Sequence, residues 1–366
     1  MPSALPQQYF TLDLLLHVLS RTFFHPFVAA LLPVCLRAVA KPYSSTSFIF
    51  TCVFAVAVSL YQVLDFANRR IAYGKPRKVR WEDEVVVITG GAGGLGNCLT
   101  EILGMKGVAI AVLDVHSQKR EKSDNEDVVK YYQCDVGDFD QVEGVWKEIL
   151  RDLGTPTILI NNAAVVNAGS LLSQTRQIAE ETFRVNVLSH YHLNRLFVHG
   201  LLNRKKGGCI VTVSSVLAHL GARHLSAYTA SKAALLAYHT SLTAELALVA
   251  PRVKTILVAP GQLDTQLFAD VKLRGWLRNF FGPVVGAGEV AVKIVDMLNK
   301  GEGGVVSEPA YARWIAWLGI LPAGLQKIVR GWSGVDMQFS GQEKSPVSAV
   351  EDKCSDSSDE SSIDEG

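Results

Sequence analysis

What the chain lacks narrows its class before any motif is considered. Its six cysteines form no C-x-x-C pair and have no partnering histidine spacing, which predicts neither a metal site nor a disulfide framework and fits a reducing compartment. With 36 Lys and Arg against 35 Asp and Glu, the formal net charge is only +1, so no overall positive charge favours nucleic acid. Metal-binding, disulfide-stapled and nucleic-acid-binding classes are therefore not expected.

Charge is also missing from residues 42–64. A stretch of this length can cross the roughly 30 Å hydrocarbon core of a bilayer, and we expect one helix to span it at residues 44–64. Basic residues follow directly, which predicts a cytosolic location for this flank and for the domain after it. They are Arg69, Arg70, Lys75, Arg77, Lys78 and Arg80. A buried core helix is the alternative interpretation.

Residues 1–80 as a whole are expected to be an N-terminal hydrophobic membrane-anchor region. The earlier apolar stretch, residues 10–39, is interrupted by charged residues and by Pro26 and Pro33, so it is a poor simple span. It fits either an interfacial amphipathic segment or one half of a membrane hairpin. A cleaved signal peptide is not expected, because no short basic, apolar and small-residue regions follow one another.

Apolar runs of strand length alternate with helical stretches over residues 81–310. Strands are predicted at residues 85–88, 108–114, 131–136, 157–162, 209–214, 253–258 and 304–307, with helices at 95–105, 175–202 and 227–249 among the intervals. Repeated β-α-β units predict a single doubly wound Rossmann-type α/β domain with a mostly parallel seven-stranded sheet. Its ligand should lie at the carboxyl ends of the strands.

A glycine-rich turn follows the first of these strands. Gly90, Gly94 and Gly96 allow a tight turn and a close approach to a pyrophosphate, which would sit at the start of the helix opened by Leu95. Asp114 ends the second strand, where a carboxylate can accept both ribose hydroxyls of NAD and repel the 2′-phosphate of NADP. The turn therefore predicts a dinucleotide site that prefers NAD.

Four side chains predict acid–base catalysis. Tyr228 is the candidate acid/base, although a free phenol has a pKa near 10, and Lys232 follows one helical turn later, where its ammonium can stabilise the phenolate. Ser215, after the fifth strand, can hydrogen-bond the substrate oxygen. Asn186 is a candidate for holding a water that links Lys232 to solvent. Each of these residues alone has an ordinary structural interpretation. Their occurrence together at these spacings is what predicts catalysis.

These motifs resemble the short-chain dehydrogenase/reductase superfamily. The resemblance rests on Thr89 to Gly96, on Tyr228-x-x-x-Lys232 with Ser215, and on further cofactor residues that it implies. They are Asp135 and Val136 (adenine side), Asn162, and Pro260, Gly261 and Thr265 (nicotinamide carboxamide side). The fourth strand ends in Asn-Asn-Ala-Ala where the family pattern is N-N-A-G, so we expect a modest loss of cofactor fit at Ala164.

Two further stretches, residues 183–190 and 241–246, are similar to a membrane-associated branch of that superfamily. It contains retinol dehydrogenases and 17-beta-hydroxysteroid dehydrogenases of the endoplasmic reticulum and lipid droplets. The resemblance implies a lipophilic substrate, contact with membrane lipid, and a possible homodimer through the helices at 175–202 and 227–249.

The carboxyl-terminal part of the chain is expected to serve the substrate side. Residues 265–286 mix apolar and basic residues, which fits a substrate lid, a contact with anionic lipid or simple closure of the core. Residues 311–340 form an apolar extension, either a membrane-surface element or a helix packed on the domain. Residues 341–366 are predicted to be a disordered acidic Ser-rich tail, regulatory if phosphorylated and otherwise inert.

The sequence therefore predicts an NAD(H)-dependent oxidoreductase that interconverts a lipophilic alcohol (retinoid, steroid or long-chain lipid) and its carbonyl. Two alternatives stay open. One is an NADPH-dependent ketoreductase of lipid synthesis, against which Asp114 argues. The other is a non-catalytic, membrane-recruited binding protein that senses NAD, against which the Ser–Tyr–Lys set argues.

Overall fold

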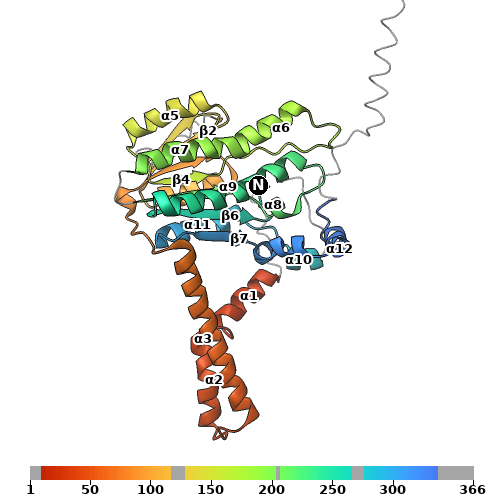
Figure 1. The fold of residues 1–366 in the computed structure, drawn as a ribbon. Helices are drawn as coiled ribbons and strands as arrows, with labels where there is room; N and C mark the ends of the chain where they lie inside the picture. The colour runs from red at the N-terminus through yellow and green to blue at the C-terminus, as the bar shows by residue number, and fades with distance from the viewer. Residues whose placement is uncertain (1–9, 117–127, 203–206, 266–275, 337–366) are drawn as a thin grey trace, which may run out of the picture.

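Seven parallel strands form one sheet at the centre of the protein (Figure 1). The computed structural model describes residues 10–116, 128–202, 207–265 and 276–336, and within them the strand order is β3-β2-β1-β4-β5-β6-β7. The strands are β1 (Val85–Thr89), β2 (Ala109–Asp114), β3 (Val129–Gln133), β4 (Ile158–Asn161), β5 (Gly208–Val213), β6 (Val253–Pro260) and β7 (Gly304–Glu308). The order reverses between β1 and β4, which confirms the predicted doubly wound α/β fold.

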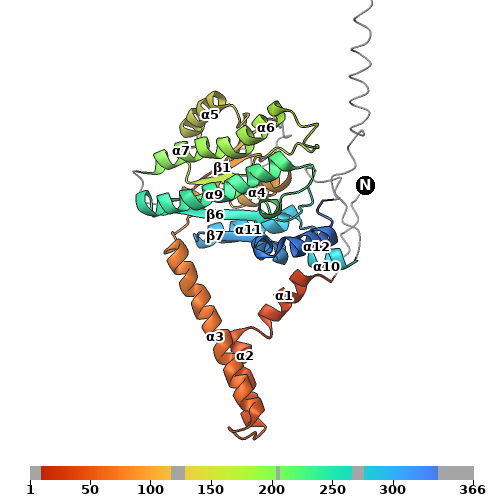
Figure 2. The same cartoon turned by 45° about the vertical axis from the view of Figure 1, so that its right-hand side comes forward.

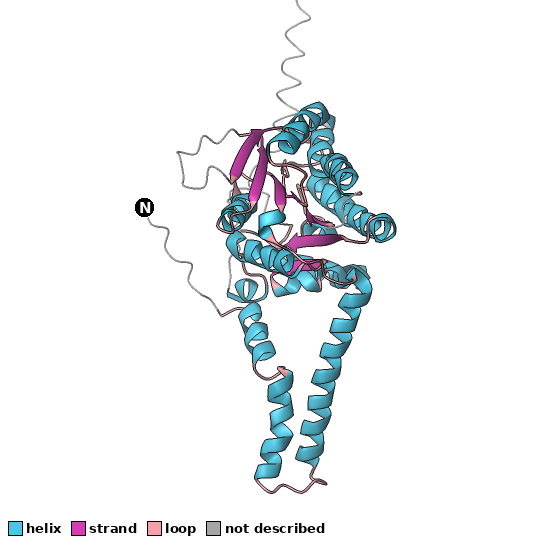
Figure 3. Cartoon of the chain, turned by 90° about the vertical axis from the view of Figure 1, so that its left-hand side faces the viewer, coloured by secondary structure: helices cyan, strands magenta, loops and turns pink. Residues whose placement is uncertain are grey.

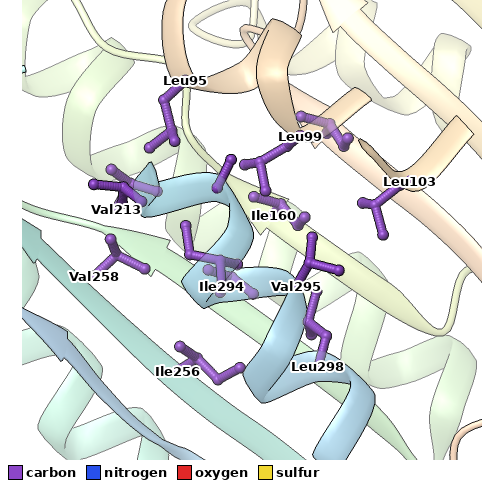
Figure 4. Close-up of a cluster of buried hydrophobic side chains, with 14 of the residues drawn as sticks. Leu95, Leu99, Leu103, Ile160, Val213, Ile256, Val258, Ile294, Val295 and Leu298 are labelled. Atoms are coloured by element: carbon purple, nitrogen blue, oxygen red, sulfur yellow. The ribbon is translucent and has the colours of Figure 1, made fainter. Parts of the chain in front are cut away.

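Helices cover both faces of the sheet and enclose two apolar cores. On one face lie α4 (Gly94–Gly104) and α11 (Ala287–Lys300), whose leucines and isoleucines meet Ile160, Ile256 and Val258 (Figure 4). The other face is covered by α5 (Phe139–Asp152), α7 (Ser189–Leu201) and α9 (Ser226–Val249). Strands buried on both sides explain the continuous apolar runs in the sequence.

Two predicted elements differ from the structure in ways that matter for the site. The long helix expected at residues 175–202 is α6 (Arg176–Phe183), a π-helical turn η2 (Arg184–Leu188) and then α7. The third strand ends at Gln133 rather than at Val136, because Asp135 Oδ1 accepts a hydrogen bond from the Gly137 backbone nitrogen at 2.8 Å and turns the chain. Asp135 and Val136 therefore lie in the loop after the strand.

Three N-terminal helices extend away from the sheet (Figure 3). They are α1 (Leu12–Arg21), α2 (Pro26–Ala38) and α3 (Thr46–Tyr73). Helix α3 is long and apolar enough to cross a membrane by length and composition, and α1 with α2 passes the same test as a pair bent by 57°. Helix α2 runs back along α3, so the two form a helical hairpin.

Both ends of this hairpin return to the edge of the sheet formed by β7 (Figure 2). After α3, the Arg77 nitrogen donates to Gly301 O at 2.9 Å, just before β7. At α1, Asp13 Oδ1 accepts from the Ala310 nitrogen at 2.6 Å, just after β7. Within residues 10–39, α2 therefore packs in a helical hairpin with α3, while α1 links this hairpin to the domain.

The segment after β7 packs beside the carboxyl ends of the strands. It comprises η4 (Ala310–Arg313), η5 (Ile315–Ile320) and α12 (Ala323–Ser333), with α8 (Leu217–Leu220) and α10 (Trp276–Phe281) nearby (Figure 2). Large apolar side chains on it are at least 48% exposed: Trp314, Trp317, Ile320, Leu325, Ile328 and Trp332. The acidic tail and residues 266–275 of the predicted lid lie outside the described residues.

Candidate active site

The glycine turn between β1 and α4 has a backbone that only glycine tolerates. Gly90 and Gly94 have positive φ values of 64° and 52°, in the left-handed region that disfavours side chains. At Gly96 the restriction is contact: an added Cβ would lie 2.1 Å from Gly90 O. The turn leads straight into the N-terminus of α4, an 11-residue helix whose first N–H groups and dipole favour an anion such as a pyrophosphate.

Polar contacts from the end of β4 hold the turn in this shape. Asn162 Nδ2 donates to Gly90 O at 2.9 Å and to Thr89 O at 3.1 Å. Thr89 Oγ1 in return accepts from the backbone nitrogens of Asn162 and Ala163, both at 3.0 Å. Asn162 thus holds the backbone of the glycine turn in place. The Thr89 hydroxyl fixes the start of the loop after β4, a role that the sequence did not indicate.

Asp114 lies at the end of β2, next to the glycine turn. Its Oδ2 accepts from the Ala92 nitrogen at 3.0 Å and its Oδ1 from the His116 nitrogen at 3.0 Å. A carboxylate held there by backbone donors is in the right place to accept ribose hydroxyls. Val136, which is 4% exposed, and Asp135 lie in the next loop of the same sheet edge.

A second loop closes over the turn from the end of β6. Thr265 comes close to the glycine turn, because an added Cβ on Gly94 would lie 3.2 Å from Thr265 Cγ2. Pro260 ends β6, and the Gly261 nitrogen donates to Glu308 O at 2.6 Å. An added Cβ on Gly261 would lie 2.5 Å from the hydroxyl of Tyr311. The segment after β7 therefore packs against this loop, a contact that the sequence did not indicate.

Ser215, Tyr228 and Lys232 come together at the carboxyl ends of β5 and β6. All three are buried, at 6%, 3% and 2% exposure, and the Ser215 and Tyr228 side chains are hydrogen-bonded. Lys232 Nζ lies 5.7 Å from the centroid of the Tyr228 ring. It donates to Val213 O at 2.9 Å. The predicted catalytic spacing therefore corresponds to one cluster in space.

Burial dominates the protonation of this cluster. It raises the pKa of Tyr228, which the hydrogen bond to Ser215 partly offsets, and it lowers the pKa of Lys232 to about 8. In this arrangement the Lys232 ammonium donates to Val213 O rather than to the phenol. The lowering of the Tyr228 pKa by Lys232 stays a prediction.

Asn186 lies in the π-helical turn η2 and is fully buried. Its Oδ1 accepts from the Val165 nitrogen at 2.8 Å, and its Nδ2 donates to Val165 O and to Ser231 Oγ, both at 3.0 Å. Ser231 directly precedes Lys232. Asn186 thus connects the loop after β4 to the helix that carries Tyr228 and Lys232, and π-turns are frequent at functional sites.

A layer of buried histidines lies behind Lys232 and was not singled out from the sequence. His190 lies in the first turn of α7 and His239 in α9, with exposures of 1% and 7%. Burial lowers the pKa of His190 to about 3, with the Lys232 charge a further cause, and that of His239 to about 4. Both therefore stay neutral at physiological pH. Among the described residues, no group of His, Cys, Asp or Glu is arranged to hold a metal.

The residues at this edge fit a dinucleotide: a glycine cradle without side chains, a helix N-terminus and a carboxylate at the adjoining strand. Together with a buried Ser–Tyr–Lys cluster, they define the class of nicotinamide-dependent oxidoreductases. The chain belongs to the short-chain dehydrogenase family, whose family model, described as short chain dehydrogenase, matches residues 84–274. It is accordingly an oxidoreductase of that family.

Known proteins similar to the chain agree with this assignment. An uncharacterized oxidoreductase of Saccharomyces cerevisiae, TDA5, is 31% identical over 260 residues, covering 70% of this chain and 78% of that protein. Human 17-beta-hydroxysteroid dehydrogenase 13 is 28% identical over 225 residues (59% and 73%). Retinol dehydrogenase 10-B of Danio rerio is 29% identical over 236 residues (57% and 70%). The last two confirm the predicted resemblance to the retinol and steroid dehydrogenase branch.

Solved structures agree on the fold. The crystal structure of 3-ketoacyl-(acyl-carrier-protein) reductase from Brucella melitensis, complexed with NADH, superposes with a TM-score of 0.55 at 18% identity. It covers 63% of this chain and 98% of that one. The superposed part is about as long as residues 81–310.

Proposed function

We propose that the protein is an NAD(H)-dependent oxidoreductase that interconverts a lipophilic alcohol and its carbonyl. The observation that carries this proposal is the hydrogen-bonded, buried Ser215–Tyr228 pair with Lys232 beside it, at the same sheet edge as the glycine turn. A buried Ser–Tyr–Lys cluster is of no use to a protein that only binds a dinucleotide, so the cluster favours catalysis over sensing.

Each side chain has a distinct role in the proposed reaction. A bound nicotinamide would supply the hydride acceptor in oxidation and the hydride donor in reduction. In the oxidative direction the Tyr228 oxygen takes the hydroxyl proton of the alcohol, and in reduction it returns it. Ser215 Oγ hydrogen-bonds the substrate oxygen, Lys232 adds positive charge near the phenol, and Asn186 positions the helix that carries both.

The preference for NAD over NADP is proposed from Asp114. Its carboxylate lies 3.0 Å from the Ala92 nitrogen of the glycine turn, where it would repel a 2′-phosphate. Asp114→Ser should raise the ratio of kcat/KM with NADP to that with NAD by about tenfold or more, since 1.4 kcal/mol of relieved repulsion is a factor of ten. Side-by-side kinetics with both cofactors measures the ratio, and an unchanged ratio would show that Asp114 does not select the cofactor.

A membrane setting is proposed from the hairpin and from the exposed apolar residues beside the site. Helix α3 has the length and composition of a span, and Trp314, Trp317 and Trp332 are exposed on the segment beside the site, as in aromatic belts at membrane interfaces. A substrate dissolved in lipid would then reach the site from the membrane. We propose the endoplasmic reticulum or a lipid droplet, with the domain in the cytosol.

A homodimer is part of the same proposal. Helices α7 and α9 carry exposed apolar side chains: Tyr191, Leu248 and Val249 are 61%, 86% and 64% exposed. Mass measurement of the purified chain in detergent, corrected for bound detergent, would distinguish a dimer from a monomer.

The deciding experiment compares two tyrosine variants on membranes carrying the full chain. Turnover is followed by nicotinamide fluorescence with retinoids, steroids and long-chain alcohols, each with NAD and with NADP. Tyr228→Phe should lower kcat by about 10²- to 10⁴-fold, the usual contribution of a general acid/base, and leave NAD binding nearly intact. The matched control is Tyr191→Phe, which removes an exposed hydroxyl and should change nothing.

The outcomes separate the candidate functions. Turnover with NAD that disappears in Tyr228→Phe supports the proposal and identifies the substrate class. A Tyr228→Phe enzyme that keeps most of its kcat contradicts the mechanism. Reduction of a ketone that depends on NADPH points instead to the ketoreductase alternative, and saturable NAD binding with no turnover of any lipid points to the binding protein.

A further inference from the structure

A cavity lies at the amino ends of the strands, where α3 joins the domain. It has a volume of about 750 Å³ and is bounded by residues 71–80 on one side and by residues 251–255 with Gly303 on the other. These segments lie at the amino ends of β1, β6 and β7. The cavity is therefore separate from the site at the carboxyl ends, which contains Ser215 and Tyr228.

The lining of this cavity carries an excess of four positive charges. Six basic side chains face two carboxylates: Lys75, Arg77, Lys78, Arg80, Arg252 and Lys254 against Asp83 and Glu84. Both carboxylates are already paired with bases of the same set. Glu84 and Arg77 form a buried pair at 3.0 Å, each side chain 5% exposed, and Asp83 pairs with Arg80 at 3.3 Å.

Lys254 is the most buried base of this set outside the Arg77–Glu84 pair. The residue is 7% exposed, and its Nζ donates to Tyr73 O, at the end of α3, at 2.8 Å. Among the described residues, no carboxylate lies within the 4.0 Å of an ion pair of its Nζ. Burial lowers its pKa, and an ammonium carries three donors of which Tyr73 O takes one. An anion in the cavity would offset the cost of keeping this charge out of water.

The end of α3 lies directly beside the Lys254 side chain. Gly74 ends α3 with a positive φ of 69°, and an added Cβ there would lie 3.4 Å from Lys254 Nζ. Helix α3 can therefore end abruptly beside the lysine, and Lys75 and Lys78 follow at the exposed rim of the cavity.

The length of α3 sets the distance between the cavity and the hydrocarbon core of the membrane. With 28 residues at about 1.5 Å each, α3 is roughly 42 Å long, and a bilayer core takes up about 30 Å of it. If residues 46–64 lie in hydrocarbon, the remaining residues 65–73 rise by about 13 Å. The headgroup layer is only about 5–7 Å thick on each side, so the mouth of the cavity then lies a few ångströms outside it, next to the membrane surface.

We propose that this cavity binds the phosphate of an anionic phospholipid headgroup from the leaflet next to the domain. The inference rests on the membrane anchoring proposed above. Arg and Lys recognise phosphate through charge-assisted hydrogen bonds, and clustered bases directly after a membrane helix are attracted to anionic lipids. A soluble phosphate would meet the same groups, but the position of the cavity directly after the membrane-length helix α3 favours lipid.

The test titrates the full chain, purified in a zwitterionic detergent, with three probes: dihexanoyl phosphatidic acid, dihexanoyl phosphatidylcholine and inorganic phosphate. Phosphatidic acid should raise the Tm by about 5 °C at 100 times its Kd, whereas phosphatidylcholine should not. Lys75→Gln with Lys78→Gln should weaken the apparent affinity for phosphatidic acid at least about tenfold. The control pair Lys106→Gln with Lys147→Gln removes the same charge elsewhere on the domain and should leave the affinity unchanged.

Lys254→Met is a second variant, examined only if its circular dichroism matches the parent, and it should weaken the affinity further. Equal shifts with both lipids, or equal losses in the cavity and control pairs, would overturn the proposal. Saturation by inorganic phosphate at the same concentration as by phosphatidic acid would also overturn it, in favour of a soluble anion. Flotation with phosphatidylcholine vesicles tests the anchoring separately: a chain that floats but ignores phosphatidic acid refutes only this inference.

Discussion

One buried lysine lies at the carboxyl ends of the strands, here called the carboxyl edge, and another at the amino ends, the amino edge. At the carboxyl edge Lys232 Nζ donates to Val213 O at 2.9 Å, and at the amino edge Lys254 Nζ donates to Tyr73 O at 2.8 Å. Burial lowers the pKa of both. Lys232 lies in α9 and Lys254 in β6, but both are buried, at 2% and 7% exposure, and both donate to a backbone carbonyl.

Their neighbours are not equivalent. Lys232 is surrounded by uncharged hydrogen-bonding groups, among them Tyr228 and the neutral His190. Lys254 lines a cavity with other bases. A lone cation among titratable neutral groups can tune a proton transfer, whereas a cation among cations can only attract an anion. The neighbours, rather than the lysine, decide the chemistry.

The largest expected effect comes from exchanging each lysine for methionine. Lys232→Met should lower kcat by about 10²- to 10⁴-fold, because it removes the charge that supports the Tyr228 phenolate, whereas Lys254→Met should leave kcat within about twofold. Steady-state kinetics on the substrate found with the panel, with NAD binding as a folding control, measures both. Equal losses of kcat would show that the two edges are not functionally separate.

The next effect concerns stability at the amino edge. Glu84→Gln leaves Arg77 as an uncompensated buried charge, since both side chains of the pair are 5% exposed. Breaking a buried pair costs about 3–5 kcal/mol. Chemical denaturation followed by tryptophan fluorescence should show this loss, and kcat at 25 °C should be unchanged in the fraction that stays folded. A loss below about 1 kcal/mol would mean that water reaches the pair.

The smallest effect is a pH dependence at the carboxyl edge. The pKa of His190 falls from 6.5 to about 3 on folding, so the unfolded chain binds a proton that the folded chain refuses. This residue therefore lowers the free energy of unfolding as the pH drops below about 6.5, by up to about 1.4 kcal/mol per pH unit down to about pH 3. The free energy of unfolding should differ between pH 5 and pH 7 by about 2 kcal/mol less in His190→Gln than in the parent, as chemical denaturation at the two pH values measures.

The sheet and the cluster could be predicted because they depend on local patterns. β-branched runs specify strands buried on both faces, and the spacing of Tyr228 and Lys232 places them on one helical turn. The glycine turn is equally local, since Gly96 can carry no side chain at 2.1 Å from Gly90 O.

Contacts between distant segments could not be predicted from such patterns. Three such contacts join segments that are far apart in the sequence. Tyr311 packs against Gly261, Asn186 hydrogen-bonds Ser231, and Asp13 accepts a hydrogen bond from the Ala310 nitrogen. Burial of His190 follows from the packing of α7 against the sheet and has no local signature. The early end of β3 depends on one side-chain hydrogen bond, from the Gly137 nitrogen to Asp135.

The two attachments of the hairpin, at Gly301 and at Ala310, lie at the two ends of β7. A third contact, from Lys254 Nζ in β6 to Tyr73 O at the end of α3, lies beside this strand and not on it. A rigid body held at two points can still turn about the line that joins them, but one held at three points out of line cannot turn at all. We therefore expect the domain to tilt together with the hairpin rather than to swing on it.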